Sequence, residues 1–212
     1  MPEPQKTFLR YHLRAETLCL GERIRGGVFR PCSPVFRYTT LTGSLTSAFS
    51  ASSPVHAVAR FLPGNSDSNR LETLTFAPHD RSRFISVIPL QIEYFANADA
   101  ELFILKTDES ARYPRRLQFS MGAMRSKGFG RCEIEFEKEV TCGNPTRGRL
   151  CVRLPDTQDV KTVFGVRNVL TARYGYLFSP TNASSGTYVK SLFEGSTIFA
   201  YPIILHPRDK SE

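Results

Sequence analysis

Alternation of apolar and polar residues is the clearest pattern in the chain, and it predicts two long strands. Residues 6–20 show it in part, and residues 132–140 show it almost throughout. Successive side chains of a strand point to opposite faces of the sheet, so each strand should bury one face. In the second strand the buried face should comprise Cys132, Ile134, Phe136 and Val140, and the opposite face Glu133, Glu135 and Glu137.

A helical period appears in two places. Within residues 39–49, Leu41, Leu45, Ala48 and Phe49 fall on one face, and Thr39 or Thr40 can cap the start. The sequence also predicts a second helix that begins at Pro114, a residue suited to a first helical turn. Its buried face would carry Leu117, Met121 and Met124, and it should end between residues 122 and 126.

The rest of the chain reads as strands and loops. Segment 21–37 is rich in glycine and proline, and residues 63–70 form the most polar stretch, which we expect to be an exposed loop. Further strands are expected at 71–77, 83–95, 100–106, 148–154, 168–178 and 186–204. With no internal repeat and no convincing linker, residues 1–212 are expected to form a single domain.

The charge of the chain points to a polyanionic partner. Its 212 residues carry a net charge of +8, with a pI near 9.4. Such a balance suits RNA, DNA or an anionic membrane surface, although a merely soluble basic protein has the same composition. Clustering of the charge favours nucleic acid, since six Lys or Arg and no Asp or Glu lie between Ser110 and Cys132.

Location and redox state follow from what the sequence lacks. It has no apolar run of about 18 residues and no apolar segment near its start, so we expect a cytoplasmic protein without a membrane span. The five cysteines are odd in number and include no C-x-x-C pair. Reduced thiols fit this spacing better than a disulfide frame or a zinc site.

The segment Gly122–Arg131 is the strongest candidate for function. It holds three glycines and three cations in ten residues, directly before the strand at 132–140. Glycine lets a backbone approach a ligand closely, and Arg and Lys neutralise phosphate. It is not a Walker A loop, because Lys127 precedes Gly128 and no Ser or Thr follows. A tight connection with a helix-ending glycine is the plainer alternative, but it leaves the cations and Phe129 unexplained.

No catalytic or metal-binding set is visible in the sequence. The four histidines, His12, His56, His79 and His206, have no paired carboxylate or His-x-x-x-His spacing. We therefore expect no catalytic residue, no cofactor and no metal ion, and we interpret the acidic face of 133–139 as a solvated strand face.

Three segments resemble the RAMP proteins of CRISPR–Cas systems, and specifically the Cas-five group. The glycine segment Met124–Ile134 is similar to the RAMP signature loop, and Tyr38–Phe49 is similar to the first-helix segment with its small residues. Residues 174–180 with 186–196 resemble the C-terminal strands of type III-D and related Cas-five subunits, and the short length of the chain suits a type VII-like effector derived from type III-D.

The resemblance implies an α+β, ferredoxin-like βαββαβ sheet. A β-hairpin insertion would occupy about residues 60–100, and a β-rich C-terminal elaboration about residues 145–212. It implies a non-enzymatic subunit that binds the 5′ handle of the guide RNA (crRNA) and anchors the backbone RAMP subunits. Target RNA or DNA would be met only indirectly.

The residues that would bind RNA follow from the same resemblance. In the glycine loop they are Arg125, Ser126, Lys127, Gly128, Phe129, Gly130 and Arg131, with Phe129 stacking on a base. Arg37 and Tyr38 would act at the start of the first helix, where backbone N–H groups favour anions. Arg23, Arg25 and Arg30 match no family motif but lie in a loop that could fold over RNA.

Two other functions stay open. One is a metal-independent RAMP endoribonuclease that processes precursor guide RNA, with His12 or His56 as acid or base. The other is a general RRM-like RNA-binding protein outside CRISPR, although Arg131 and Cys132 break the RRM aromatic motif that Lys127–Gly130 begins.

Overall fold

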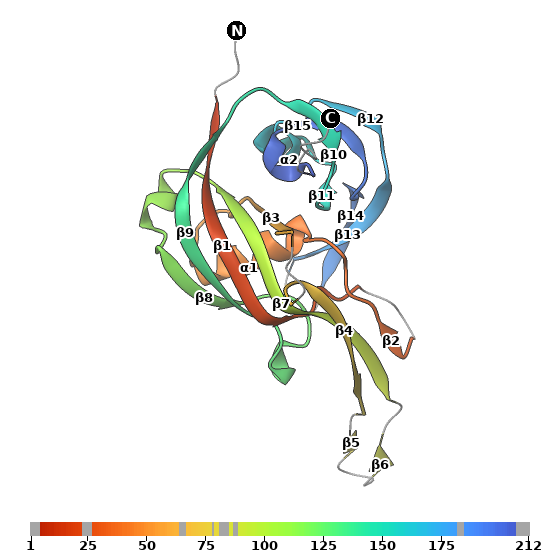
Figure 1. Ribbon diagram of the computed structural model, residues 1–212. Helices are drawn as coiled ribbons and strands as arrows, with labels where there is room; N and C mark the ends of the chain where they lie inside the picture. Colours follow the sequence, from red (N-terminus) through yellow and green to blue (C-terminus); the bar gives the residue numbers. More distant parts are fainter. Residues whose placement is uncertain are drawn as a thin grey trace.

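The computed structural model describes residues 5–22, 27–63, 67–77, 79–80, 85–86, 89–181 and 185–206. Its main element is a seven-stranded sheet with a central order β2-β7-β1-β9-β8, to which β3 and β4 add by pairing with β7 (Figure 1). The seven strands are β1 (Lys6–Leu18), β2 (Phe29–Arg30), β3 (Ala57–Phe61), β4 (Arg70–Phe76), β7 (Leu90–Leu105), β8 (Arg116–Ser120) and β9 (Arg131–Cys142). All pairs are antiparallel except β2 with β7, so the sheet is mixed.

One helix of the described chain follows β1 and β2 in the sequence, precedes β3, and packs on this sheet. Helix α1 (Tyr38–Ala48) buries Leu41 and Leu45, as its apolar spacing predicts. Arg37 takes the N-cap position in an extended conformation, so neither Thr39 nor Thr40 is the cap. Short 3-10 helices also occur in the described residues: η1 (Glu109–Arg112), η2 (Arg125–Lys127) and η3 (Pro202–Ile204).

The predicted second helix after Pro114 is wrong. Residues Arg116–Ser120 form β8, which pairs with β9 from Arg116↔Glu135 to Ser120↔Arg131. Leu117 and Met121 are four residues apart, and that spacing fits a strand as well as a helix. Phe119, which lies between them and is buried, shows the strand period. The βαββαβ order is therefore not followed throughout the described residues.

The C-terminal part is a β-rich unit, as expected, with one short helix that the sequence did not reveal. It contains two three-stranded sheets, β10-β15-β12 and β11-β14-β13. Its elements are β10 (Thr146–Arg149), β11 (Leu154–Pro155), α2 (Gln158–Val163), β12 (Asn168–Thr171), β13 (Tyr174–Pro180), β14 (Gly186–Leu192) and β15 (Thr197–Ala200). Few helices and a mixed sheet make the chain α+β.

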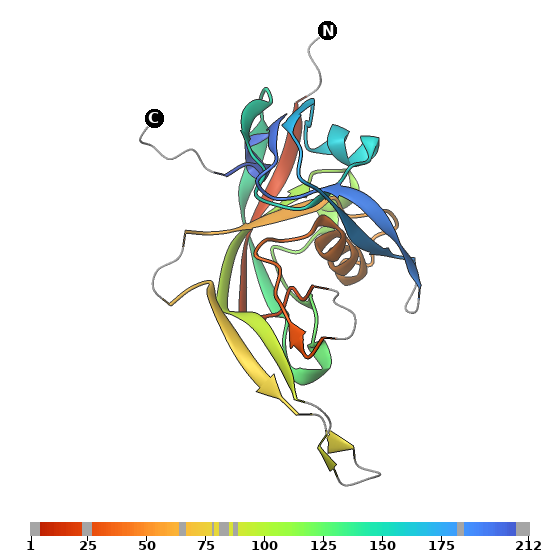
Figure 2. The same cartoon turned by 90° about the vertical axis from the view of Figure 1, so that its right-hand side faces the viewer.

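A hairpin of β4 with the first half of β7 projects away from the sheet (Figures 1 and 2). Two short strands, β5 (His79–Asp80) and β6 (Ile85–Ser86), pair near its far end. Asn69 and Asn97 mark its base, both with positive φ. The Asn69 amide donates to the carbonyls of Leu62 and Asp99 at 2.9 and 3.0 Å, which fixes the point of departure.

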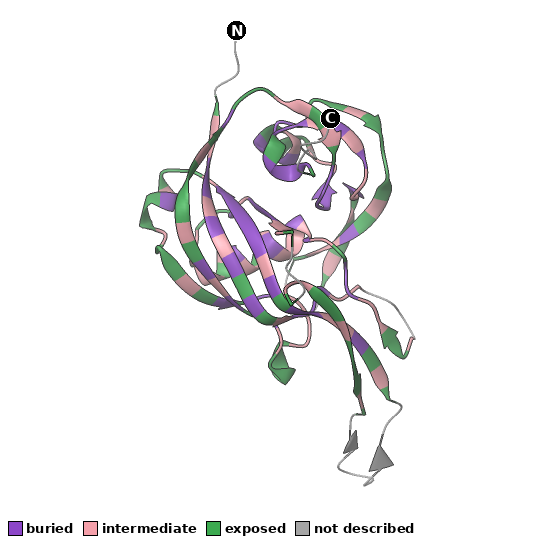
Figure 3. Ribbon diagram, viewed as in Figure 1, coloured by how far each residue is buried: buried purple, intermediate pink, exposed green. Residues whose placement is uncertain are grey.

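Two apolar clusters hold the sheet. Buried positions follow β1 and the second half of β7, where a strand lies between neighbours (Figure 3). One cluster packs Leu13 and Leu102 against Leu41 and Leu45 of α1. In the other, the ring of Phe8 stacks on Phe164 with centroids 5.9 Å apart, and this joins β1 to the C-terminal part.

Candidate nucleic-acid interface

The glycine loop connects β8 to β9 and is held by backbone hydrogen bonds at both ends. The Met121 amide donates to the Gly130 carbonyl at 2.9 Å and closes the loop. The Ala123 amide donates to the Cys19 carbonyl at 2.8 Å, and the Gly130 amide donates to the Thr17 carbonyl at 2.7 Å. The loop is therefore fastened to the end of β1.

The three glycines of the loop differ in what surrounds them, although all have positive φ. A Cβ on Gly130 would lie 1.9 Å from the Met121 carbonyl oxygen, and one on Gly122 would lie 2.4 Å from the Cys19 carbonyl oxygen. These two glycines are required by the fold. Gly128 is exposed, and a Cβ there would meet nothing within 4 Å, so its backbone is open to a ligand.

The cations of the loop lie at the surface. Arg125, Ser126 and Lys127 are all exposed. The Lys127 ammonium lies 4.6 Å from the ring centroid of Phe76, in the projecting hairpin. The Arg131 guanidinium donates to the Gln118 amide oxygen at 2.9 Å on the neighbouring strand. An exposed cation held this loosely can exchange its contacts for a phosphate.

Phe129 is not the exposed ring that the sequence suggested. It is half-buried and meets Tyr94 of β7 edge to face, with centroids 5.1 Å apart. Phe129 therefore packs the glycine loop against the base of the hairpin, and its ring has one partner already.

Two clefts open on either side of the glycine loop. The first, here called the α1 cleft, has a volume of about 690 Å³ and separates the loop from α1. Its lining includes Arg37, Thr39, Thr40, Gly43, Ser44 and Ser47 on the helix side, Gly122, Ala123 and Arg125 on the loop side, and Phe178 and Pro180 of β13. Gly43 is exposed, and a Cβ there would meet nothing within 4 Å.

The second cleft, here called the β1 cleft, has a volume of about 640 Å³ and lies over the outer ends of β1 and β9. Gly128 and Arg131 line it together with Arg14. Its lining also includes the carboxylate residues Glu16, Asp99 and Glu133. The described residues that line the α1 cleft include two arginines and no carboxylate, so its electrostatics favour an anion more than those of the β1 cleft.

Arg37 and Tyr38 are placed differently from what the resemblance implies. The Arg37 guanidinium is largely buried and donates to the carbonyls of Leu20 and Gly21 at 3.0 and 2.6 Å. Burial lowers the pKa of Arg37, and Glu22 acts in the opposite direction. Arg37 thus lines the α1 cleft, but its Nη2 donor is used within the protein, and its buried Nε has no hydrogen-bond partner among the described residues.

The Tyr38 ring points into the core and cannot serve as an RNA contact here. It is 7% exposed, and its hydroxyl lies 2.5 Å from Nδ1 of His56. Burial raises the pKa of Tyr38 to about 12. The burial of Tyr38 could have been predicted from the sequence, because Tyr38 lies three residues before Leu41 and so falls on the buried face of the helix.

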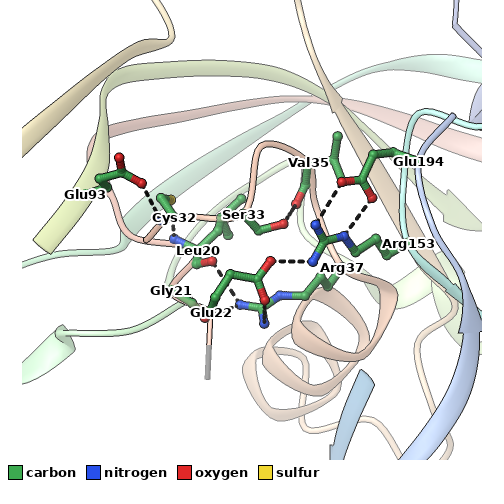
Figure 4. Close-up of polar contacts among 10 residues, drawn as sticks. All are labelled: Leu20, Gly21, Glu22, Cys32, Ser33, Val35, Arg37, Glu93, Arg153 and Glu194. Atoms are coloured by element: carbon green, nitrogen blue, oxygen red, sulfur yellow. Dashed lines mark hydrogen bonds and ion pairs between the residues drawn. The ribbon is translucent and has the colours of Figure 1, made fainter. Parts of the chain in front are cut away.

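A buried ion cluster behind the α1 cleft was not visible in the sequence (Figure 4). Arg153 donates to both carboxylate oxygens of Glu194 at 2.7 and 2.8 Å and pairs with Glu22 through Nη1. Its side chain is 9% exposed. Burial opposes the charge, but the pairs with Glu194 and Glu22 prevail and raise the pKa of Arg153. The cluster joins segment 21–37 to the C-terminal part.

Three further arginines were predicted to bind RNA, namely Arg23, Arg25 and Arg30. Arg23 and Arg25 lie outside the described residues. Arg30 lies in β2, opposite Ile92 of β7, and lines neither cleft.

The two best-placed histidines each have a partner. His12 Nε2 contacts a carboxylate oxygen of Asp99, which lines the β1 cleft. His56 lies under Tyr38, and burial lowers the pKa of its imidazole. Neither contact could be inferred from spacing along the chain.

The described residues include no cluster of three or more His, Cys, Asp or Glu that could hold a metal ion. On the acidic face of β9, Glu133 and Glu135 pair with Arg116, and Glu137 pairs with Arg10. The five cysteines are buried and unpaired. Of the helices in the described part of the chain, none has the length and apolar character to span a membrane.

Comparison with known proteins identifies the fold and no family. No protein-family model matches the chain, and no curated protein does. The chain is similar to one in the cryo-EM structure of the Type III-B Cmr-beta bound to cognate target RNA. The TM-score is 0.60 at 9% identity, and the match covers 90% of this chain and 86% of that chain.

The same Cmr-beta with cognate target RNA and AMPPnP, in state 1, gives a TM-score of 0.57 at 7% identity, with the same coverage of both chains. At these identities the similarity establishes a shared fold.

Proposed function

We propose that this chain is a non-catalytic RNA-binding subunit of a CRISPR effector ribonucleoprotein, in which it caps the 5′ handle of the guide RNA. The observation that carries the proposal is the α1 cleft. It places the exposed Arg125 of the glycine loop opposite Gly43 and the small polar residues of α1.

The lining of the α1 cleft suits a phosphate backbone. Single-stranded RNA is held by phosphate contacts and by stacking of its bases. Gly43 leaves room for close approach, and Thr39, Thr40 and Ser44 supply hydroxyl groups beside it. The net charge of +8 adds a long-range attraction for a polyanion.

The shared fold supports the same proposal. The two chains compared above come from Cmr-beta bound to cognate target RNA. Two of the three segments that carry the RAMP resemblance contribute to opposite sides of the α1 cleft, Met124–Ile134 through Arg125 and Tyr38–Phe49 through the residues of α1. Two segments that are far apart in sequence but share one cleft make a common ligand the simplest explanation.

The projecting hairpin of β4 and β7 is the element we assign to the backbone subunits. It extends beyond the sheet and exposes Leu71 and Leu74, which are 51% and 41% accessible (Figure 2). The hairpin is tied to the glycine loop through Phe76 at the end of β4 and Tyr94 of β7. RNA binding and subunit contact would therefore be mechanically linked.

The direct test is purification of the tagged protein from its native host, followed by sequencing of the bound RNA. Short RNAs that share one constant 5′ end, together with a repeated backbone subunit, are the expected result. RNA of diverse sequence, or none, would refute the CRISPR assignment.

Charge removal tests the loop itself. Lys127→Ala with Arg131→Ala should lower the salt slope for single-stranded RNA by about 1.4, at about 0.7 for each phosphate contact. Matched changes at Lys138 and Arg147, exposed and outside both clefts, should leave the slope unchanged. An equal slope in the folded double variant would show that Lys127 and Arg131 make no phosphate contact.

One contact favours a second function, metal-independent cleavage of precursor RNA. His12 lies against Asp99 at the β1 cleft, where Arg14 and Arg131 also lie. A carboxylate can orient an imidazole for proton transfer. Incubation of precursor RNA with the protein and a chelator distinguishes the two functions. An enzyme would produce RNA that ends in a cyclic phosphate, and the His12→Ala variant would not form this product.

A further inference from the structure

The hairpin of β13 and β14 presents an aromatic face that the proposed function does not use. Directly opposed residues of an antiparallel pair share a face, and here the pairs are Tyr176↔Lys190 and Phe178↔Tyr188. Tyr174 lies on the same side, two residues before Tyr176. Tyr174, Tyr176 and Tyr188 are 51%, 66% and 55% exposed. We call Tyr174, Tyr176, Phe178, Tyr188 and Lys190 the tyrosine face.

The rings of the tyrosine face are supported but not covered. The Lys190 ammonium lies 3.9 Å from the ring centroid of Tyr174, and Phe178 meets Tyr188 edge to face at 5.5 Å. On the other side of the hairpin, Leu177 and Ser191 are 3% and 0% exposed, which seats the strands on the protein. A seated hairpin holds its aromatic rings in place at little further cost in entropy.

Charge distinguishes RNA from a protein as the occupant. Exposed tyrosines suit both, since they are enriched at protein interfaces and also stack on bases. From Val160 to Phe193 the chain has four Lys or Arg and no Asp or Glu. Asp159 and Glu194 bound this stretch, and the Lys190 ammonium lies 4.0 Å from a carboxylate oxygen of Asp156. The described residues of the β13–β14 hairpin itself carry the cation of Lys190 and no carboxylate, and this favours a polyanion.

The tyrosine face also continues from the α1 cleft. Phe178 and Pro180 of β13 line that cleft together with Arg125 and α1. Figure 2 shows the β13–β14 hairpin running past α1. An RNA strand whose phosphate backbone lies in the α1 cleft would leave the cleft along β13. Beyond Phe178, the first aromatic rings that it would then meet are those of Tyr188 and Tyr176.

We propose that the tyrosine face stacks unpaired bases of the same single-stranded RNA whose backbone occupies the α1 cleft. The proposal rests on the RNA-binding function proposed above and adds a second contact region to it. Aromatic rings next to cations bind single strands with little sequence preference. The tyrosine face therefore extends the footprint on RNA and does not select a sequence.

The test compares a short and a long oligouridine by fluorescence anisotropy, about 5 and about 15 nucleotides long, which bracket a single-strand site. Tyr176→Ser with Tyr188→Ser should weaken the long probe at least about fivefold for each base that stacks, and leave the short probe unchanged. Tyr176→Phe with Tyr188→Phe is the matched control and should bind both probes like the wild type, since the rings remain.

Intrinsic fluorescence gives a second readout, because the chain has eight tyrosines and no tryptophan. Stacking of the long probe should quench tyrosine emission in the wild type and much less in the serine variant. Wild-type affinity of the serine variant for the long probe would overturn the proposal. So would unchanged RNA binding together with loss of a protein subunit from the purified complex, which would identify a protein interface.

Arg125→Ala separates this proposal from the proposed function. If it weakens both probes while the serine variant weakens only the long one, both assignments stand. If it weakens neither while the serine variant still weakens the long probe, the α1 cleft fails as the RNA site and the tyrosine face stands alone.

Discussion

Gly43→Ala separates the stability of the fold from RNA binding in a single substitution. Gly43 is the sixth residue of α1, which runs from Tyr38 to Ala48, and its surface faces the α1 cleft. A Cβ at this position would meet no atom within 4 Å beyond its chain neighbours and the backbone of its own helix. The added methyl group therefore changes helix propensity and the free space of the cleft, and leaves the packing of the protein as it is.

The two effects have opposite signs. Alanine is favoured over glycine in a helix interior by about 1 kcal/mol, so the variant should be more stable. For a chain of this size that gain raises Tm by about 2–4 °C. RNA affinity should fall about tenfold if a phosphate backbone lies against Gly43, because an intruding methyl group in a close contact costs about 1–3 kcal/mol.

Thermal unfolding followed by circular dichroism measures the first effect, and anisotropy of a labelled single-stranded RNA at fixed salt measures the second. Gly143→Ala is the matched control, since Gly143 is also exposed with open space around its Cβ position but lines neither cleft. A stabilised Gly43→Ala that binds RNA like the wild type would refute the assignment of the α1 cleft. A Gly43→Ala variant that is less stable than the wild type would refute the argument that the added methyl group meets no other part of the protein.

Three further predictions concern the fold and its charges. Gly130→Ala should lower the free energy of unfolding by at least about 3 kcal/mol, because its Cβ would lie 1.9 Å from a carbonyl oxygen and its φ is positive. Gly128→Ala should lower it by only about 1 kcal/mol, because only the positive φ opposes the change. Similar urea midpoints for the two variants would contradict this difference. Arg153→Met should lower the free energy of unfolding by about 3 kcal/mol, since it leaves the carboxylates of Glu22 and Glu194 without their partner, and a urea midpoint near that of the wild type would argue against it. Burial lowers the pKa of His56 below its ordinary 6.5, so the stability that it contributes is present above pH 6.5 and declines as the pH falls below that value. Urea midpoints between about pH 8 and about pH 5 should show this decline, and His56→Gln should reduce it.

Local periodicity was enough to predict the long elements. The expected strand at 6–20 corresponds to β1, the helix at 39–49 to α1, and the strand at 132–140 to β9. Each buries one face over many residues, so its period is unambiguous. Residues 90–95 of the strand expected at 83–95 and nearly all of the one expected at 100–106 belong to a single strand, β7, while Ile85 and Ser86 form β6 and residues 83, 84, 87 and 88 lie outside the described residues. Strand β7 changes partner along each of its edges, from β4 to β3 on one and from β2 to β1 on the other. A change of strand partner cannot be recognised from the local pattern of apolar and polar residues.

The polar interior could not be predicted in the same way. Arg153 pairs with Glu22 across 131 positions of the chain and with Glu194 across 41. Before the topology is known, a buried arginine has the same sequence appearance as a surface one. For the same reason Arg37 looked available to RNA, although its guanidinium is bonded to the carbonyls of Leu20 and Gly21.

The residues of the glycine loop have two different roles, since some hold the loop to the fold and others are open to a ligand. Gly122 and Gly130 permit the bonds by which the loop is fastened to Cys19 and Thr17 at the end of β1. The loop is thus shaped by the fold before any ligand arrives, and binding need not supply the free energy to order it. Gly128 and Arg125 are then free to meet a phosphate without disturbing those bonds. Loss of charge at Arg125 should for this reason change RNA affinity and its salt dependence while the free energy of unfolding stays nearly constant.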